Sequence, residues 1–185
     1  MPGPSWLEHA DDALLAERAG DGDVWAFECL LRRHLGLMRA VAFRLTRSAH
    51  DAEDATQEAC VTAWQSMDTL RDPAQVRSWF LRIVSRKAID RVRARRADVD
   101  LGAVASPADT RPGPELRVET GSQMQELSRI LGALPELQRE CWLLREVGGM
   151  SYRETADTLG ESESTVRGAL SRARKALFAG MENWR

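Results

Sequence analysis

Arginine and lysine side chains gather in two separate stretches of the sequence, where they could bind a polyanion. Residues 71–98 carry nine bases against three acids, and residues 164–178 carry four bases and no acid. Guanidinium and ammonium groups bind phosphate through charge-assisted hydrogen bonds, and arginine also reads guanine edges. Although the formal net charge is only -2, this distribution predicts two separate contacts with nucleic acid.

The residues that could support catalysis or bind a metal are scattered. The sequence has three histidines and three cysteines, and none show the spacing of metal ligands: His9, His34, His50, Cys29, Cys60 and Cys141. No glycine-rich loop precedes a helix, and no nucleophile motif occurs. We therefore expect neither an enzyme nor a small-molecule substrate, metal or other cofactor, and we expect the cysteines to be small core residues.

The hydropathy pattern argues against a membrane protein. No stretch approaches the roughly 20 apolar residues that cross a bilayer, and the N-terminus lacks a basic start followed by an apolar run. We expect a cytoplasmic protein without membrane insertion.

The composition predicts an all-α fold, because alanine, leucine, arginine and glutamate dominate and aromatic residues make up only 6%. Apolar periodicity predicts helices near residues 12–19, 23–34, 36–47, 50–66, 74–96, 122–132, 136–147, 151–159 and 163–181. Between Ala97 and Thr120 this periodicity fails, and prolines and glycines collect with an acidic balance. We therefore predict two small helical domains, residues 1–97 and 121–185, joined by a flexible acidic linker over 98–120.

The helix expected from about His50 has two unlike sides. Four alanines at helical spacing, together with the nearby Trp64, predict a buried side. The other faces carry an acidic surface made of Asp51, Glu53, Asp54, Gln57 and Glu58. This surface is either a solvated helix start that suits the helix dipole or a docking face for a basic partner.

The next long segment combines an apolar side, from Val76 to Ile89, with a row of basic residues. Such a helix could bind DNA with its arginines and the aromatic residues at its start. It could equally be an amphipathic core helix whose arginines keep it soluble and whose Trp79 is a packed anchor. The pattern alone favours neither interpretation.

Residues 150–177 have the pattern of a helix-turn-helix. Ser151 and Glu154 can form a capping box, Gly160 can end the first helix in the left-handed conformation, and Ser162 can cap the second. The apolar residues of the second helix recur at steps of four, three and four, which predicts one inward stripe: Val166, Leu170, Ala173 and Leu177. The outward residues could meet base edges first and phosphates later. An ordinary helical hairpin with a basic face is the alternative.

Three of these segments resemble parts of the extracytoplasmic-function (ECF) class of bacterial sigma factors, the promoter-recognition subunits of RNA polymerase. DAEDATQEACVTAW, residues 51–64, resembles the helix of region two that docks on the clamp coiled coil of the polymerase. VRSWFLRIVSRKAIDRVR, residues 76–93, resembles the adjoining part that opens and reads the minus-ten element. Residues 134–177 resemble region four, whose helix-turn-helix reads the minus-thirty-five element.

The resemblance implies the partners and the residues that contact them. The partners are core RNA polymerase, through its clamp coiled coil and its flap, promoter DNA, and an anti-sigma factor. Polymerase docking falls to the acidic surface, led by Asp54, Gln57 and Glu58, and the loop of residues 66–76 with the helix after it would hold an extruded base. Contacts with the minus-ten element fall to Arg77, Trp79, Arg82, Arg86, Lys87, Arg91 and Arg93. Contacts with the minus-thirty-five element fall to Ser164, Thr165, Arg167, Ser171, Arg172, Arg174 and Lys175.

The sequence departs from the family pattern at Ala169, which stands where an arginine is expected and predicts the loss of one DNA contact. The alternative function is a free-standing transcriptional regulator, in which only the C-terminal helix pair reads DNA and the N-terminal helices sense or dimerise. Such a protein would shift a specific duplex at nanomolar concentration without polymerase.

Overall fold

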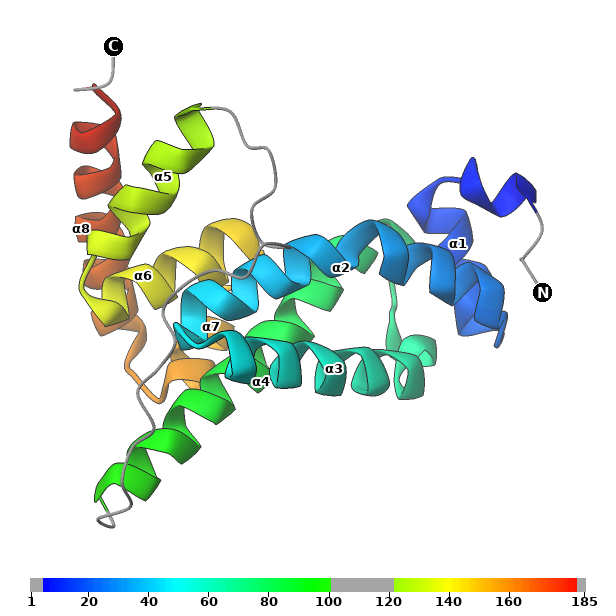
Figure 1. Ribbon diagram of the computed structural model, residues 1–185, viewed down its shortest axis with the longest axis horizontal. Helices are drawn as coiled ribbons and strands as arrows, with labels where there is room; N and C mark the ends of the chain where they lie inside the picture. The colour runs from blue at the N-terminus through cyan, green and yellow to red at the C-terminus, as the bar shows by residue number, and fades with distance from the viewer. Residues whose placement is uncertain (1–4, 101–121, 183–185) are drawn as a thin grey trace.

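The computed structural model describes residues 5–100 and 122–182, and within these ranges the regular elements are helices and no strand occurs (Figure 1). The predicted all-α fold with two helical domains is confirmed. The predicted linker falls almost wholly on residues 101–121, outside the described residues. The α-helices are α1 Asp12–Gly20, α2 Val24–Thr46, α3 Ala49–Gln65, α4 Val76–Asp100, α5 Ser122–Ala133, α6 Glu136–Trp142, α7 Tyr152–Leu159 and α8 Glu163–Glu182.

Helix α2 is continuous, so the predicted division into two helices at residue 35 is wrong. One buried apolar face continues along α2 on both sides of residue 35, formed by Leu30, Met38 and Val41. A side chain at Gly36 would meet nothing within 4 Å, so this glycine lies on an open surface of the helix. Glycine costs a helix about 1 kcal/mol relative to alanine. Burial of the stripe on both sides of Gly36 outweighs that cost.

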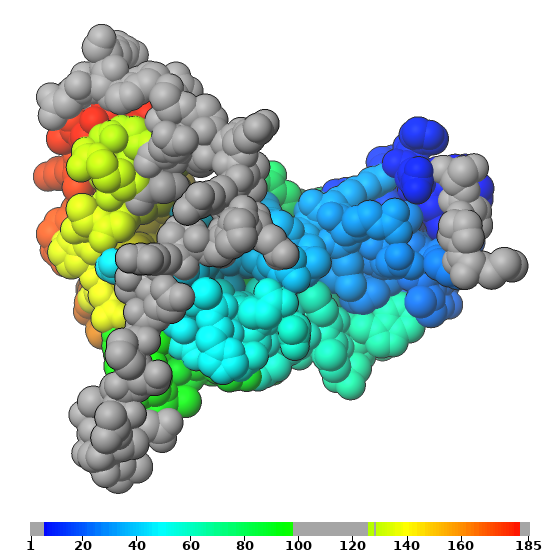
Figure 2. All heavy atoms as spheres, viewed as in Figure 1, coloured from blue at the N-terminus to red at the C-terminus, as the bar shows by residue number. Residues whose placement is uncertain are grey.

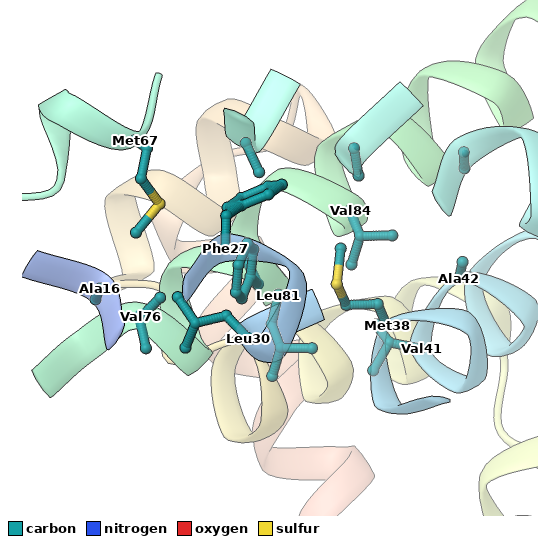
Figure 3. Close-up of a cluster of buried hydrophobic side chains, with 14 of the residues drawn as sticks. Ala16, Phe27, Leu30, Met38, Val41, Ala42, Met67, Val76, Leu81 and Val84 are labelled. Atoms are coloured by element: carbon teal, nitrogen blue, oxygen red, sulfur yellow. The ribbon is translucent and has the colours of Figure 1, made fainter. Parts of the chain in front are cut away.

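The N-terminal domain is built around α2 and α4. In Figure 3, Phe27, Leu30 and Met38 of α2 lie close to Leu81 and Val84 of α4, and all five side chains are buried. Helix α3 closes this core with its alanines, which let it approach both neighbours: Ala52, Ala55, Ala59 and Ala63 are at most 3% exposed.

Trp64 does not belong to the buried alanine side of α3, and that part of the prediction is wrong. Its position is one residue beyond Ala63, about 100° further around the helix. The indole is 39% exposed, and its ring lies 5.0 Å from that of Phe27.

The C-terminal domain has two small apolar clusters that share α8. Ile130 and Leu134 pack with Leu177 between α5 and α8, whereas Cys141 packs with Leu170 among α6, α7 and α8. The predicted inward stripe of α8 is confirmed, because its four residues are at most 7% exposed.

The two domains pack against each other through α4. Leu143 lies in the π-helical turn Leu143–Val147 that follows α6, yet it is only 1% exposed and belongs to the core of the N-terminal domain. Leu159, at the end of α7, is half-buried and packs against clusters of both domains. Figures 1 and 2 show the C-terminal helices gathered at one end of the molecule, beside α4 and the start of α3.

Candidate polymerase and nucleic-acid interfaces

The acidic residues of α3 are paired with basic residues of α4. The Arg91 guanidinium lies 2.7 Å from the Asp54 carboxylate and also hydrogen-bonds to Glu58, while Arg95 lies 2.5 Å from Asp51. The hydrogen bond that Arg91 donates to Glu58, with the charges of both carboxylates, raises the pKa of Arg91. The structure therefore brings together two sets of residues to which the sequence assigns different partners.

The rest of the acidic surface faces α2 and solvent. Glu53 pairs with Arg39 of α2 at 3.1 Å, and the Gln57 amide donates a hydrogen bond to Glu53 at 3.3 Å. Among the five predicted polymerase-binding residues, Gln57 and Glu58 are exposed and the other three are half-buried. A partner that approaches α3 would meet these two side chains first.

The outward face of α4 carries basic side chains without an acidic neighbour. Arg77 and Arg86 are exposed, and within the described parts of the chain no carboxylate lies at ion-pair distance from either. Lys87 is half-buried and lies 3.8 Å from Glu58. Trp79 is half-buried, with its ring 5.6 Å from that of Phe80. Arg77 and Arg86 are therefore exposed members of the predicted minus-ten set whose charge no carboxylate of the described residues neutralises.

Other basic residues of α4 contact the C-terminal domain. Arg82 lies 3.4 Å from Glu154 of α7, and Arg93 donates a hydrogen bond to the Thr158 carbonyl at 2.7 Å. Arg96 pairs with Glu136 of α6. Two residues of the predicted minus-ten set thus hold α7 in place.

The predicted helix-turn-helix is present, with the expected caps. The Ser151 hydroxyl accepts from the Glu154 amide at 3.1 Å, and the Glu154 carboxylate accepts from the Ser151 amide at 2.8 Å. The hydrogen bond from the Ser151 amide is the main cause that lowers the pKa of Glu154. Gly160 ends α7 with a φ of 70°, and the Ser162 hydroxyl accepts from the Thr165 amide at 3.1 Å.

Helix α8 presents most of its predicted DNA-binding residues to solvent. Thr165 is half-buried, and the other six members of the set are exposed. Arg174 pairs with Glu146 at 2.6 Å and Arg167 with Glu163 at 3.1 Å, whereas no acidic partner of Arg172 occurs in the described ranges. Ala169 is fully buried in the domain core. Position 169 therefore offers no side chain to DNA in this chain.

Sequence reasoning missed Tyr152 and Arg145. The guanidinium carbon of Arg145 lies 4.4 Å from the centre of the Tyr152 ring, and that of Arg167 lies 4.5 Å from the same ring. Tyr152 is the only tyrosine of the chain, which is the one signal that singles it out. The position of Tyr152 in the sequence does not indicate that its side chain contacts Arg167 of α8.

An open cleft of about 520 Å³ lies beside the loop of residues 66–76. Met67, Asp68, Leu70 and Pro73 line it from the loop, and Ala16, Glu17, Gly20 and Asp21 line it from α1 and its end. The lining is more polar than apolar, and the carboxylates of Glu17, Asp21 and Asp68 offer acceptors to a base that carries an exocyclic amino group. The contribution of α1 to this cleft was not predicted.

One buried carboxyl lies close to the domain boundary. Burial, together with the charge of Glu136, raises the pKa of Glu140 to about 7, although the charges of Arg96, Arg139 and Arg93 act in the opposite direction. Glu140 is only 6% exposed. This carboxyl therefore titrates near neutral pH.

The described residues show no metal centre and no membrane span. They contain no group of three or more His, Cys, Asp or Glu side chains that could hold a metal ion. None of the helices in these ranges is both long and apolar enough to cross a bilayer. Cys29 and Cys141 are buried, Cys60 is half-buried, and all three are free thiols.

Comparison with known proteins places both domains in the same order in one family. Residues 30–97 match Sigma-70 region 2, and residues 124–177 match Sigma-70 region 4. The chain is 35% identical over 172 residues to the ECF RNA polymerase sigma factor SigM of Mycobacterium tuberculosis, which covers 92% of this chain and 84% of that protein. It is 32% identical over 177 residues to the RNA polymerase sigma factor CnrH of Cupriavidus metallidurans, covering 91% of this chain and 93% of that one.

Two solved structures have a similar fold along both domains. The sigma factor RpoE in complex with the anti-sigma factor NepR, from Bartonella quintana, aligns with a TM-score of 0.62 at 25% identity, over 88% of this chain and 100% of that chain. CnrH in complex with the cytosolic domain of CnrY aligns with a TM-score of 0.54 at 30% identity, over 93% and 97%. The chain belongs to the ECF class of RNA polymerase sigma factors, the non-enzymatic initiation factors that direct transcription to promoters.

Proposed function

We propose that this sigma factor docks on core RNA polymerase through α3 and reads two promoter elements with α4 and α8. The N-terminal domain, residues 1–97, would sit on the clamp coiled coil, and the C-terminal domain, residues 121–185, would sit near the flap. The observation that carries the proposal is the placement of two outward basic faces on different domains, with Arg86 on α4 and Arg172 on α8.

The N-terminal domain would open and hold the minus-ten element. Arg77 and Arg86 supply exposed charges for the phosphates of the opened strand. The cleft beside residues 66–76 would take a base from the stack. Because extruding a base costs a few kcal/mol, the phosphate contacts and the polymerase contacts must supply that energy.

Polymerase docking on α3 would also change the charges available to DNA. A basic side chain of the polymerase that binds Asp54 and Glu58 competes with Arg91 for the same carboxylates. Arg91 is then released for phosphate. Docking and DNA binding would therefore favour each other.

The C-terminal domain would read the minus-thirty-five element with α8. Arg167 lies near the start of this helix, where a recognition helix meets base edges, and Arg172, Arg174 and Lys175 follow toward the phosphates. Joined by residues 98–120, the two domains gain effective concentration when both are held on the polymerase.

We also infer an anti-sigma partner and a cytoplasmic site of action without catalytic activity or a small-molecule substrate. One similar solved structure is a complex with the anti-sigma factor NepR, the other is a complex with the cytosolic domain of CnrY, and both align over most of this chain. The polymerase and promoter to which a sigma factor binds lie in the cytoplasm.

Co-sedimentation with core polymerase, followed by run-off transcription of genomic fragments, tests the proposal. The protein should sediment with the polymerase, and the sequenced transcripts should share two upstream elements. Absence of both results would contradict the proposal. A specific duplex shift at nanomolar concentration without polymerase would instead support the free-standing regulator, which the family membership does not favour.

A further inference from the structure

Tyr152 connects three elements of the C-terminal domain through its ring. Arg145, from the π-helical turn, lies 4.4 Å from the ring centre, and Arg167, from α8, lies 4.5 Å from it. Arg145 also hydrogen-bonds to the Met150 carbonyl, in the segment that leads into α7. Tyr152 is half-buried, whereas the Arg167 side chain is 61% exposed. The ring therefore connects the exposed Arg167 side chain of α8 to the half-buried start of α7.

Arg167 contacts Tyr152 and Glu163, and the two contacts differ in whether they leave the N–H donors of the guanidinium free. A guanidinium stacked on an aromatic ring uses its face, and its N–H donors lie in its plane, directed away from the ring. Glu163 instead accepts one of those in-plane donors at 3.1 Å. Guanine is read by two in-plane donors that reach O6 and N7. The contact with Tyr152 is compatible with base reading, and the contact with Glu163 competes with it.

We propose that Tyr152 is a positioning residue that fixes the Arg167 guanidinium for reading one base of the minus-thirty-five element. This inference rests on the proposed function of α8. A free arginine side chain loses much rotamer freedom when it binds a base, and a guanidinium already held by stacking loses less. Tyr152 would thus set selectivity at a position that it does not touch.

The ring also packs against the cluster formed by α6, α7 and α8, and this role can be separated from stacking. Tyr152→Phe keeps both the packing and the aromatic face and removes only the hydroxyl, which contacts Arg174 of α8. Because Tyr152→Leu loses the same hydroxyl, comparison of the two variants isolates the effect of the ring. Tyr152→Leu keeps an apolar contact but removes the stacking surface. If only packing matters, both variants should resemble each other once thermal unfolding shows that they are folded.

The test uses the full chain with core polymerase and a template pool in which the upstream element is randomised. Sequencing the transcripts gives the base preference at each position. Arg167→Ala should abolish the preference at one position. Tyr152→Leu should weaken the preference at that same position by about two- to fivefold and leave the others unchanged, while Tyr152→Phe should keep it.

If Tyr152→Leu is unstable, Tyr152→Met, which also keeps an apolar side chain and removes the ring, takes its place. A further variant tests whether the contact with Glu163 competes with base reading. Glu163→Gln removes the competing charge from an exposed residue in the first turn of α8, so it should strengthen the same preference. Three outcomes would overturn the inference. Tyr152→Leu could weaken the preference equally at every position, or both Tyr152→Leu and Glu163→Gln could leave the preference unchanged. The third is an Arg167→Ala variant that keeps the wild-type preferences. A wild-type chain that yields no transcripts would overturn the proposed function itself.

Discussion

Arg91 of α4 and Asp54 of α3 form an ion pair of 2.7 Å, so a residue expected to bind DNA is bound to one expected to bind polymerase. The two side chains are 33% and 29% exposed, which keeps the pair within reach of either partner. When polymerase binds Asp54, the positive charge of Arg91 is no longer neutralised by it, and when DNA binds Arg91, the negative charge of Asp54 is exposed.

Reversing the charge at Asp54 should weaken polymerase binding by at least about tenfold, because a carboxylate predicted to meet a basic partner becomes a like charge. Asp54→Arg also loses the pair with Arg91. The double variant Asp54→Arg with Arg91→Asp restores a pair between these two positions but places a carboxylate beside Glu58, so it should recover part of the thermal stability without recovering polymerase affinity. Affinity by fluorescence anisotropy and unfolding by circular dichroism separate the two effects. Full recovery of affinity in the swapped protein would remove Asp54 from the docking face.

Removing the ion pairs across the domain boundary should separate the domains. Glu154→Gln keeps the capping box of α7 but loses the pair with Arg82, and Glu136→Gln loses the pair with Arg96. Exposed pairs are worth up to about 1 kcal/mol each, so the double variant should shift the equilibrium by up to about 30-fold. Small-angle scattering should report a larger radius of gyration. Asp157→Asn, on the exposed side of α7, is the control, and identical scattering from both proteins would contradict the expectation.

Arg172→Ala should reduce the salt dependence of promoter binding. If this side chain neutralises one phosphate, the slope of log affinity against log salt falls in magnitude by about 0.9. The measurement compares the polymerase complex on one promoter over a range of salt concentrations. Arg129→Ala, which removes an exposed arginine that pairs with Glu126 within α5, should leave the slope unchanged. A slope unaffected by Arg172→Ala would show that this residue makes no phosphate contact.

The stability of the protein should fall as pH rises from about 4.5 to 7 because of Glu140. Its folded-state pKa, about 7, lies above the ordinary value of 4.5, so the folded protein holds a proton that the unfolded chain releases. The lost stability is about 3 kcal/mol above pH 7. Glu140→Gln should therefore gain stability over the wild type between pH 5 and 8, as measured by urea unfolding. Asp157→Asn serves as control, and a Glu140→Gln effect that is constant with pH would contradict the assignment.

The local features of the fold could be predicted because they depend on residues close in sequence. The capping box of Ser151 and Glu154, the left-handed Gly160 and the inward stripe of α8 each follow from spacing within one or two helical turns. The continuity of α2 through residue 35 could not be predicted from local propensity, because packing over the whole helix decides it.

The partners of the site residues could not be predicted because they come from distant parts of the chain. Spacing along α4 places Arg91 and Arg93 on a polar side, but it does not reveal that one meets Asp54 and the other the Thr158 carbonyl. The contact between Tyr152 and Arg167 likewise depends on how α7 crosses α8. The sequence therefore predicts candidate surfaces, whereas the contacts between them emerge only from the fold.

Leu143 gives the arrangement of the domains an energetic consequence. This side chain is supplied by one domain and buried in the core of the other, so pulling the domains apart transfers it into water. Exposing a buried leucine costs about 1.5–3 kcal/mol. Reaching two distant DNA sites at once therefore requires Leu143 to leave its buried position. The partner that holds the two domains apart has to bury this leucine in an apolar surface of its own.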